Sequence, residues 1–135
     1  IAETLRELGL QKGMVVYGSG LDEIAIHGET QVAEIHGEHI RYHTLTPADF
    51  GLKYYTLEAI RGGDPDENRK ITEKLLAGKG TDAQQAAIAI NLSPLLVMGG
   101  KADDLKQGAE LAIETLRSGD ALDKVTQLAT LSHKE

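Results

Sequence analysis

The chain has 135 residues, of which 41% are hydrophobic, and it contains no cysteine. This length suits one domain or part of one, and the lack of cysteine excludes disulfides and thiolate zinc sites and agrees with a cytoplasmic location. The formal net charge is −7, with no dense cluster of Lys and Arg. We therefore expect no nucleic-acid partner and no membrane partner, and no apolar run is long enough to span a bilayer.

The first residues predict a helix over 1–8. Leu5 and Leu8 share one face of it, and Gly9 follows as a C-terminal stop. Neither an initiator Met nor an N-cap residue precedes Ile1. We therefore expect that upstream sequence has been removed, so the lack of a signal peptide says little about targeting.

A strand that ends in glycines follows this helix. Residues 14–20 read Met-Val-Val-Tyr-Gly-Ser-Gly, and Leu21 separates them from two adjacent carboxylates, Asp22 and Glu23. Small residues at the carboxyl end of a parallel strand let the backbone turn sharply or approach a phosphate. Carboxylate oxygens at such an edge suit Mg²⁺, which a phosphorylated substrate could share. We therefore take Asp22 and Glu23 as candidate metal ligands beside a parallel sheet.

The position of this acidic pair is more informative than its existence. Chance placement of 21 acids in 135 residues predicts about three adjacent pairs, and the chain has three. The other two, Asp66-Glu67 and Asp103-Asp104, stand where helices should begin, and acids are favoured there. The pair Asp22-Glu23 instead follows a strand that ends in glycine.

Residues 30–44 predict a β-hairpin. Gly37-Glu38 is its turn, because glycine is preferred at the first central position of a type II′ turn. The resulting register pairs Ile35 with Ile40 and Ala33 with Tyr42 on an apolar face, and His36 with His39 and Glu34 with Arg41 on a wet face. Residues 24–27, which alternate lightly, are a candidate for a further strand.

Capping signals divide the rest of the chain into helices. Thr46 and Pro47 begin a short turn that carries Phe50 toward the core. Longer helices are predicted from Asp64 to Gly78, from Ala83 to Met98, from Asp103 to Arg117, and after Asp120. With no linker or internal repeat between them, the strands and helices indicate one mixed α/β unit.

The helix over 83–98 has almost no polar face, which predicts a central helix packed on all sides. Pro94 should kink it, because its ring removes a hydrogen bond and clashes with the carbonyl of Ile90. Before this helix, the segment Gly78-Lys79-Gly80-Thr81 resembles the end of a phosphate-binding loop. The preceding strand and leading glycine of such a loop are missing, so we interpret the segment as a helix-to-helix turn with Thr81 as N-cap.

The histidines offer a second candidate for a metal site. His27, His36, His39 and His43 lie close together in the sequence, and imidazole is a common zinc ligand. The hairpin register sets His36 and His39 beside an exposed turn, and His43 opposite Val32. Bringing three rings onto one ion would distort the strand pairing, so we favour solvated surface histidines.

Four segments in order resemble anthranilate phosphoribosyltransferase, and the likeness runs over essentially the whole chain. Residues 15–23 read Val-Val-Tyr-Gly-Ser-Gly-Leu-Asp-Glu, and residues 45–52 read Leu-Thr-Pro-Ala-Asp-Phe-Gly-Leu. Residues 62–68 read Gly-Gly-Asp-Pro-Asp-Glu-Asn, and the fourth segment, 76–91, begins with Leu-Ala-Gly-Lys-Gly and ends at Asn91. Tyr17 departs from the family, which more often has His at this position. The resemblance implies a mixed-sheet domain of the phosphoribosyltransferase and nucleoside phosphorylase type.

The resemblance also implies a reaction. The family transfers phosphoribosyl from phosphoribosyl pyrophosphate to anthranilate in tryptophan biosynthesis, with the help of Mg²⁺ that its Asp-Glu pair ligates. That role falls on Asp22 and Glu23 here. Adjacent residues of a regular strand point to opposite faces, so we expect irregular backbone at this pair, or two ions that each favour one carboxylate.

Much of the family's site has no counterpart in these residues. The glycine-rich phosphate loop, the Lys-His-Gly-Asn stretch and the Arg that binds anthranilate are upstream in the family. We therefore expect residues 1–135 to be the C-terminal part of the α/β domain, inactive alone, in a parent that dimerises through a separate helical domain. A pyrimidine-nucleoside phosphorylase relative, which needs no acid pair for Mg²⁺, and a non-catalytic interaction module are the alternatives.

Overall fold

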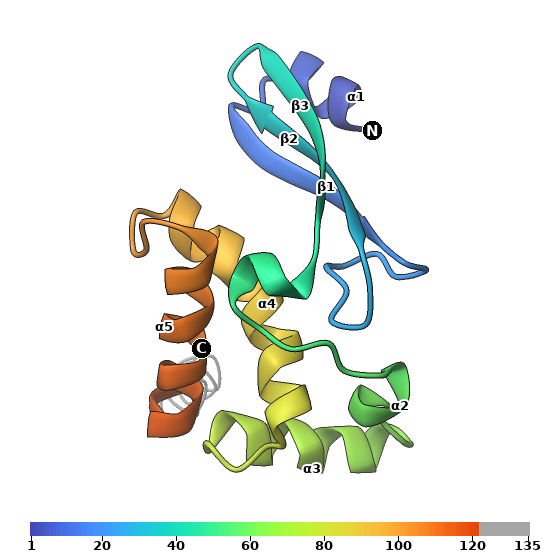
Figure 1. Ribbon diagram of the computed structural model, residues 1–135, viewed down its shortest axis with the longest axis vertical. Coiled ribbons are helices and arrows are strands. Elements are labelled where there is room, and N and C mark those ends of the chain that lie inside the picture. The colour runs from blue at the N-terminus through green and yellow to red at the C-terminus, as the bar shows by residue number, and fades with distance from the viewer. Residues whose placement is uncertain (122–135) are drawn as a thin grey trace, which may run out of the picture.

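The sheet and the later helices occupy opposite ends of the molecule in the computed structural model, which describes residues 1–121 (Figure 1). Helix α1 (Ala2–Glu7) lies beside the sheet, and the later helices gather at the other end. This arrangement confirms the mixed α/β class predicted from the sequence. Of the helices in the described residues, none has the length and apolarity needed to cross a membrane.

The sheet has three strands in the order β1-β2-β3, and both pairings are antiparallel. The strands are β1 (Lys12–Gly18), β2 (Thr30–His36) and β3 (His39–Leu45). The expected parallel arrangement is therefore wrong for the pairings that the structure describes. A parallel neighbour requires a long crossover, usually a helix, whereas residues 19–29 between β1 and β2 contain no helix or strand.

The predicted hairpin register is confirmed. Ile35 pairs with Ile40, and His36 pairs with His39 on either side of the turn. Gly37 has a φ of 63°, whereas Glu38 keeps a negative φ, as a type II′ turn requires. The turn chemistry alone was therefore sufficient to align the two strands.

The predicted division of the hairpin into one apolar and one wet face is wrong. Ile35 is buried near the turn, but Val32 and Leu45, on the opposite face, are buried at the far end. Tyr42, which was expected to face inward, is 67% exposed. The two ends pack on different partners, because α1 contacts β2 whereas the main core takes Val32 and Leu45.

The helices begin where capping signals predict them. The side chains of Asp64, Thr81 and Asp104 each accept a hydrogen bond from the backbone N–H three residues later. The helical elements are η1 (Pro47–Phe50), α2 (Leu57–Ile60), α3 (Pro65–Leu76), α4 (Asp82–Met98) and α5 (Leu105–Ser118). Gly78 follows α3 with a φ of 83°, which confirms its predicted turn. The residues predicted to form the apolar face of a last helix, from Leu122 onward, lie outside the described residues.

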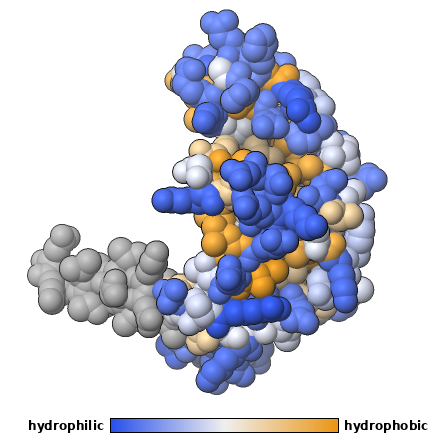
Figure 2. Space-filling view, turned by 60° about the vertical axis from the view of Figure 1, so that its left-hand side comes forward, coloured by the Kyte–Doolittle hydropathy of each residue, from blue (hydrophilic) through white to orange (hydrophobic). Residues whose placement is uncertain are grey.

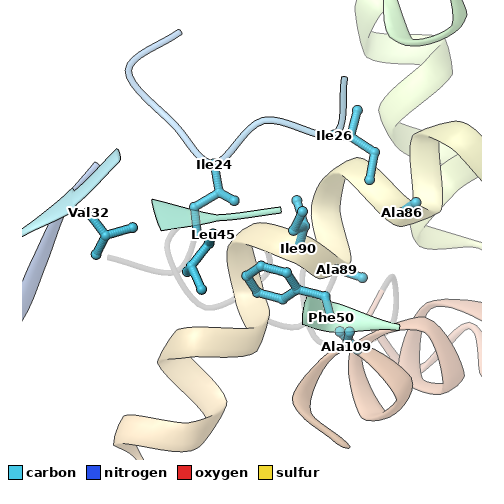
Figure 3. Close-up of a cluster of buried hydrophobic side chains, with 10 residues drawn as sticks. Ile24, Ile26, Val32, Leu45, Phe50, Ala86, Ala89, Ile90 and Ala109 are labelled. Carbon is cyan, nitrogen blue, oxygen red and sulfur yellow. The ribbon is translucent and has the colours of Figure 1, made fainter. Parts of the chain in front are cut away.

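The main core lies where α4 meets α5, η1 and the end of the sheet. Figure 3 shows the Phe50 ring among Ile90, Ala89 and Ala109, and these four residues come from three different elements. Phe50 is 1% exposed, so the short η1 turn delivers it inward as predicted. Small buried residues on α4 and α5 let these two helices approach closely.

Helix α4 is only partly buried, contrary to the prediction of a helix packed all round. It runs through Pro94 as one helix, and its Leu92 and Leu95 are 38% and 60% exposed. Leu95 lines a groove of about 410 Å³ together with Met14 and Val16 of β1. Apolar surface is also visible between the sheet end and the helices in Figure 2.

Candidate metal site

A tight turn carries the chain from β1 toward the acidic pair. The N–H of Gly18 donates to the Leu21 carbonyl at 2.9 Å, and the N–H of Leu21 donates back at 3.0 Å. Between them, Ser19 and Gly20 have φ values of 47° and 100°, so both are left-handed. A side chain at Gly18 would overlap the backbone of Glu23 and Ala25. Glycine is therefore required where the loop folds back against the strand end.

Asp22 and Glu23 directly follow this turn and are both exposed. Each stands at a bend of the chain rather than in a strand, which confirms the expected irregular backbone. Within residues 1–121 neither carboxylate forms an ion pair. The pair therefore offers free carboxylate oxygens to solvent at the end of β1.

The residues after the pair are buried although they form no strand. Ile24, Ala25 and Ile26 are at most 6% exposed. The expected strand over 24–27 is absent: no strand pairs with it, and bonds from other parts of the chain, including the N–H of Tyr55 to the Ile26 carbonyl, satisfy its backbone. Asn91 of α4 bonds to both backbone groups of Ile24, and Thr30 Oγ1 accepts from the N–H of Ala25 at 2.9 Å.

Asn91 and Thr30 are the structural residues of this site that reasoning from the sequence missed. Asn91 is 67 positions away from Ile24 along the chain. The available signal was a polar residue within the largely apolar stretch 86–98 of the helix, because a partly buried polar group needs a partner. The partner itself could not be read from the pattern.

A depression of about 330 Å³ adjoins the acidic pair. Glu23 lines it together with Leu21, and the opposite wall comes from α2 and the residue after it, with Glu58 and Arg61. Arg61 is exposed. The hollow therefore brings one cation and two carboxylates to the same surface.

The structure does not gather the histidines into a metal site. His36 and His39 face each other across the exposed turn, and His43 Nε2 lies 3.0 Å from Glu34 Oε2. His27 Nε2 lies 3.2 Å from the carbonyl oxygen of Ser19. In the described part of the chain, no three His, Asp or Glu side chains are close enough to hold a metal ion.

A known protein family matches most of the chain. The family described as "Glycosyl transferase family, a/b domain" matches residues 1–122. The chain belongs to this family. Its resemblance to anthranilate phosphoribosyltransferase is also confirmed by the relatives that it matches.

These relatives are considerably longer than the chain. Anthranilate phosphoribosyltransferase of Tolumonas auensis is 84% identical over all 135 residues, which cover 40% of that protein. The enzyme of the same name from Aeromonas salmonicida is 59% identical over the same share. The chain thus spans about two fifths of the length of the curated relatives it matches.

Solved structures of the same enzyme share the fold. The one from Thermus thermophilus has a TM-score of 0.79 at 39% identity, covering 90% of this chain and 35% of that one. The Saccharomyces cerevisiae enzyme in complex with PRPP and Mg has a TM-score of 0.73 at 29% identity, covering 83% of this chain and 32% of that one. The yeast enzyme is therefore known with both PRPP and Mg bound.

The donor set at Asp22 and Glu23 fits Mg²⁺. Magnesium is commonly held by one or two carboxylates, with water and substrate phosphates completing its shell. Two exposed carboxylates without protein partners in the described residues match this pattern. A closed site of three or more protein ligands is not needed, so the lack of a cluster of three such ligands among the described residues is no obstacle.

Proposed function

We propose that the chain supplies the Mg²⁺-binding part of an enzyme that transfers phosphoribosyl from phosphoribosyl pyrophosphate to anthranilate. The observation that carries the proposal is the exposed pair Asp22-Glu23, presented on an anchored loop at the end of β1. The names of the relatives and the PRPP and Mg in the yeast complex support it. A yeast structure with 4-fluoroanthranilate supports the acceptor.

In that reaction, the residues of this chain would bind the metal and hold the metal-binding loop in place. Asp22 and Glu23 would hold the metal, and the Gly18-Leu21 turn and the buried segment 24–26 would keep their backbone in place. Bound Mg²⁺ would neutralise the pyrophosphate and stabilise the charge that grows on it as its bond to the sugar loosens. We assign no general acid or base to these residues.

The remaining parts of the active site are proposed to lie outside these 135 residues. The sequence contains no Gly-Thr-Gly-Gly-Asp loop, and it spans 40% of the relatives' length. We propose that it is the C-terminal part of the α/β domain, and that phosphate binding, anthranilate binding and dimerisation belong to the rest of the parent protein. The chain by itself should not catalyse the transfer of phosphoribosyl to anthranilate.

Isothermal titration calorimetry tests the metal site. Mg²⁺ should give a heat with the complete natural protein and phosphoribosyl pyrophosphate that exceeds the heat of titrating phosphoribosyl pyrophosphate alone, and this excess should be lost when Asp22→Asn and Glu23→Gln are combined. The matched control is Asp66→Asn with Glu67→Gln, an adjacent acidic pair at the start of α3. Identical titrations for both double changes would contradict the proposal and favour a non-catalytic module.

A further inference from the structure

The backbone of Ile24 is held by one side chain from the helical part of the molecule. The N–H of Ile24 donates to Asn91 Oδ1 at 2.8 Å, and Asn91 Nδ2 donates to the Ile24 carbonyl at 3.2 Å. The same Nδ2 donates to the Ala87 carbonyl of α4 at 3.0 Å. Asn91 thus satisfies Ile24 as a paired strand residue would, from a side chain fixed to its own helix.

These bonds are partly shielded from water. Ile24 is 6% exposed, and Asn91 lies with it in the wall of the apolar groove beside β1. A backbone group buried without a partner is strongly unfavourable, and a hydrogen bond is stronger where water is excluded. The two bonds therefore define the position of Ile24, whose peptide group is directly joined to Glu23.

The loop that carries the acidic pair is fixed on both sides of the pair. Asp22 and Glu23 are exposed and form no ion pair in the part of the chain that the structure describes. On the upstream side, the Gly18-Leu21 turn fixes the loop to β1. On the downstream side, Asn91 fixes the residue next to Glu23 to α4, and Thr30 holds the following residue, Ala25, so the pair lies between anchors on both sides.

We propose that Asn91 is a positioning residue for the metal-binding pair, a role that rests on the proposed function. By restricting the backbone at Ile24, Asn91 reduces the conformational freedom that Asp22 and Glu23 lose when a metal and its phosphate ligand bind. Its loss should weaken Mg²⁺ binding while leaving the reaction at saturating Mg²⁺ largely intact.

The test compares Asn91→Ala and Asn91→Ser with the unchanged complete protein. Both lose the bonds to Ile24, but the serine hydroxyl can still bond to the Ala87 carbonyl, which preserves the helix if alanine destabilises it. Amide hydrogen exchange in a peptide covering 19–29 should become faster in both variants. The Mg²⁺ concentration for half-maximal transfer should rise about tenfold, as expected for two hydrogen bonds.

Ser93→Ala is the matched control, because Ser93 is a buried residue of α4 whose hydroxyl bonds instead to the Leu105 carbonyl. It should leave the Mg²⁺ requirement and the exchange of 19–29 unchanged. If Asp22→Asn raises the Mg²⁺ requirement but neither Asn91 variant does, the positioning role is overturned and the proposed function stands. If Asp22→Asn has no effect either, the proposed function fails, and the positioning role fails with it.

Discussion

Nε of Arg117 donates a hydrogen bond to Oε1 of Gln85 at 3.1 Å and so joins α5 to α4. At the other end of the same amide, Gln85 Nε2 donates to the carbonyl of Gly80 at 3.2 Å. Gln85 is 4% exposed, so both of its polar ends find partners inside the protein, as burial requires. The contact ties the turn before α4 to the last turn of α5.

Gln85→Ala should therefore lower the free energy of unfolding by about 2 kcal/mol, because it leaves the Gly80 carbonyl and the Arg117 guanidinium without this partner. Urea unfolding followed by circular dichroism measures the change. Asp82→Asn is the control, since Asp82 also approaches Arg117, at 3.7 Å, but on the exposed surface. It should have little effect. Equal losses in the two variants would refute the importance of the buried amide.

Gly108→Ala should destabilise the protein even though alanine favours helices. In an exposed helix this change would stabilise by about 1 kcal/mol. Here the new Cβ would lie 2.6 Å from Ser93 Oγ and 2.8 Å from the Ser93 carbonyl oxygen, so α5 must move away from α4. We expect a net loss of about 2 kcal/mol in thermal unfolding, with Glu110→Ala, an exposed change on the same helix, near neutral. A rise in melting temperature for Gly108→Ala would be inconsistent with this close contact.

The apolar groove beside β1 should bind a hydrophobic dye in the 135-residue chain. Leu95, at its rim, is 60% exposed, and Leu95→Gln keeps a good helix former while removing apolar surface. The fluorescence of bound anilinonaphthalene sulfonate should fall by roughly half. Tyr54→Gln, which removes a similarly exposed ring away from the groove, is the control and should leave the signal unchanged. A dye response that is absent, or insensitive to Leu95, would count against an open groove.

Local signals in the sequence predicted the local structure well. The caps at Asp64 and Thr81 and the turn at Gly37 were confirmed, because each depends on residues within a few positions of one another. The irregular backbone at Asp22 and Glu23 was also predicted, since adjacent ligands cannot share one face of a regular strand.

Contacts between separate elements were harder to predict from the sequence. The direction of the strand that pairs with β1 depends on the path of the connecting loop, and the sequence pattern of β1 is compatible with either direction. The burial of Val32 on the face predicted to be wet depends on which elements cover each end of the hairpin. Neither fact follows from periodicity alone, because both depend on how separate elements pack against one another.

The side chains that hold the buried segment at Ile24 bond to its main chain, and this affects how the sequence of such a site can vary. Asn91 recognises the main chain of Ile24, and Thr30 recognises the main chain of Ala25, so neither depends on which side chains the segment carries. The bonds that hold this loop therefore place no demand on the identity of residues 24 and 25, whose side chains are restricted only by the packing around them. In a divergent homologue, an amide side chain at the middle of the long helix would identify the loop more reliably than the residues adjacent to the acids.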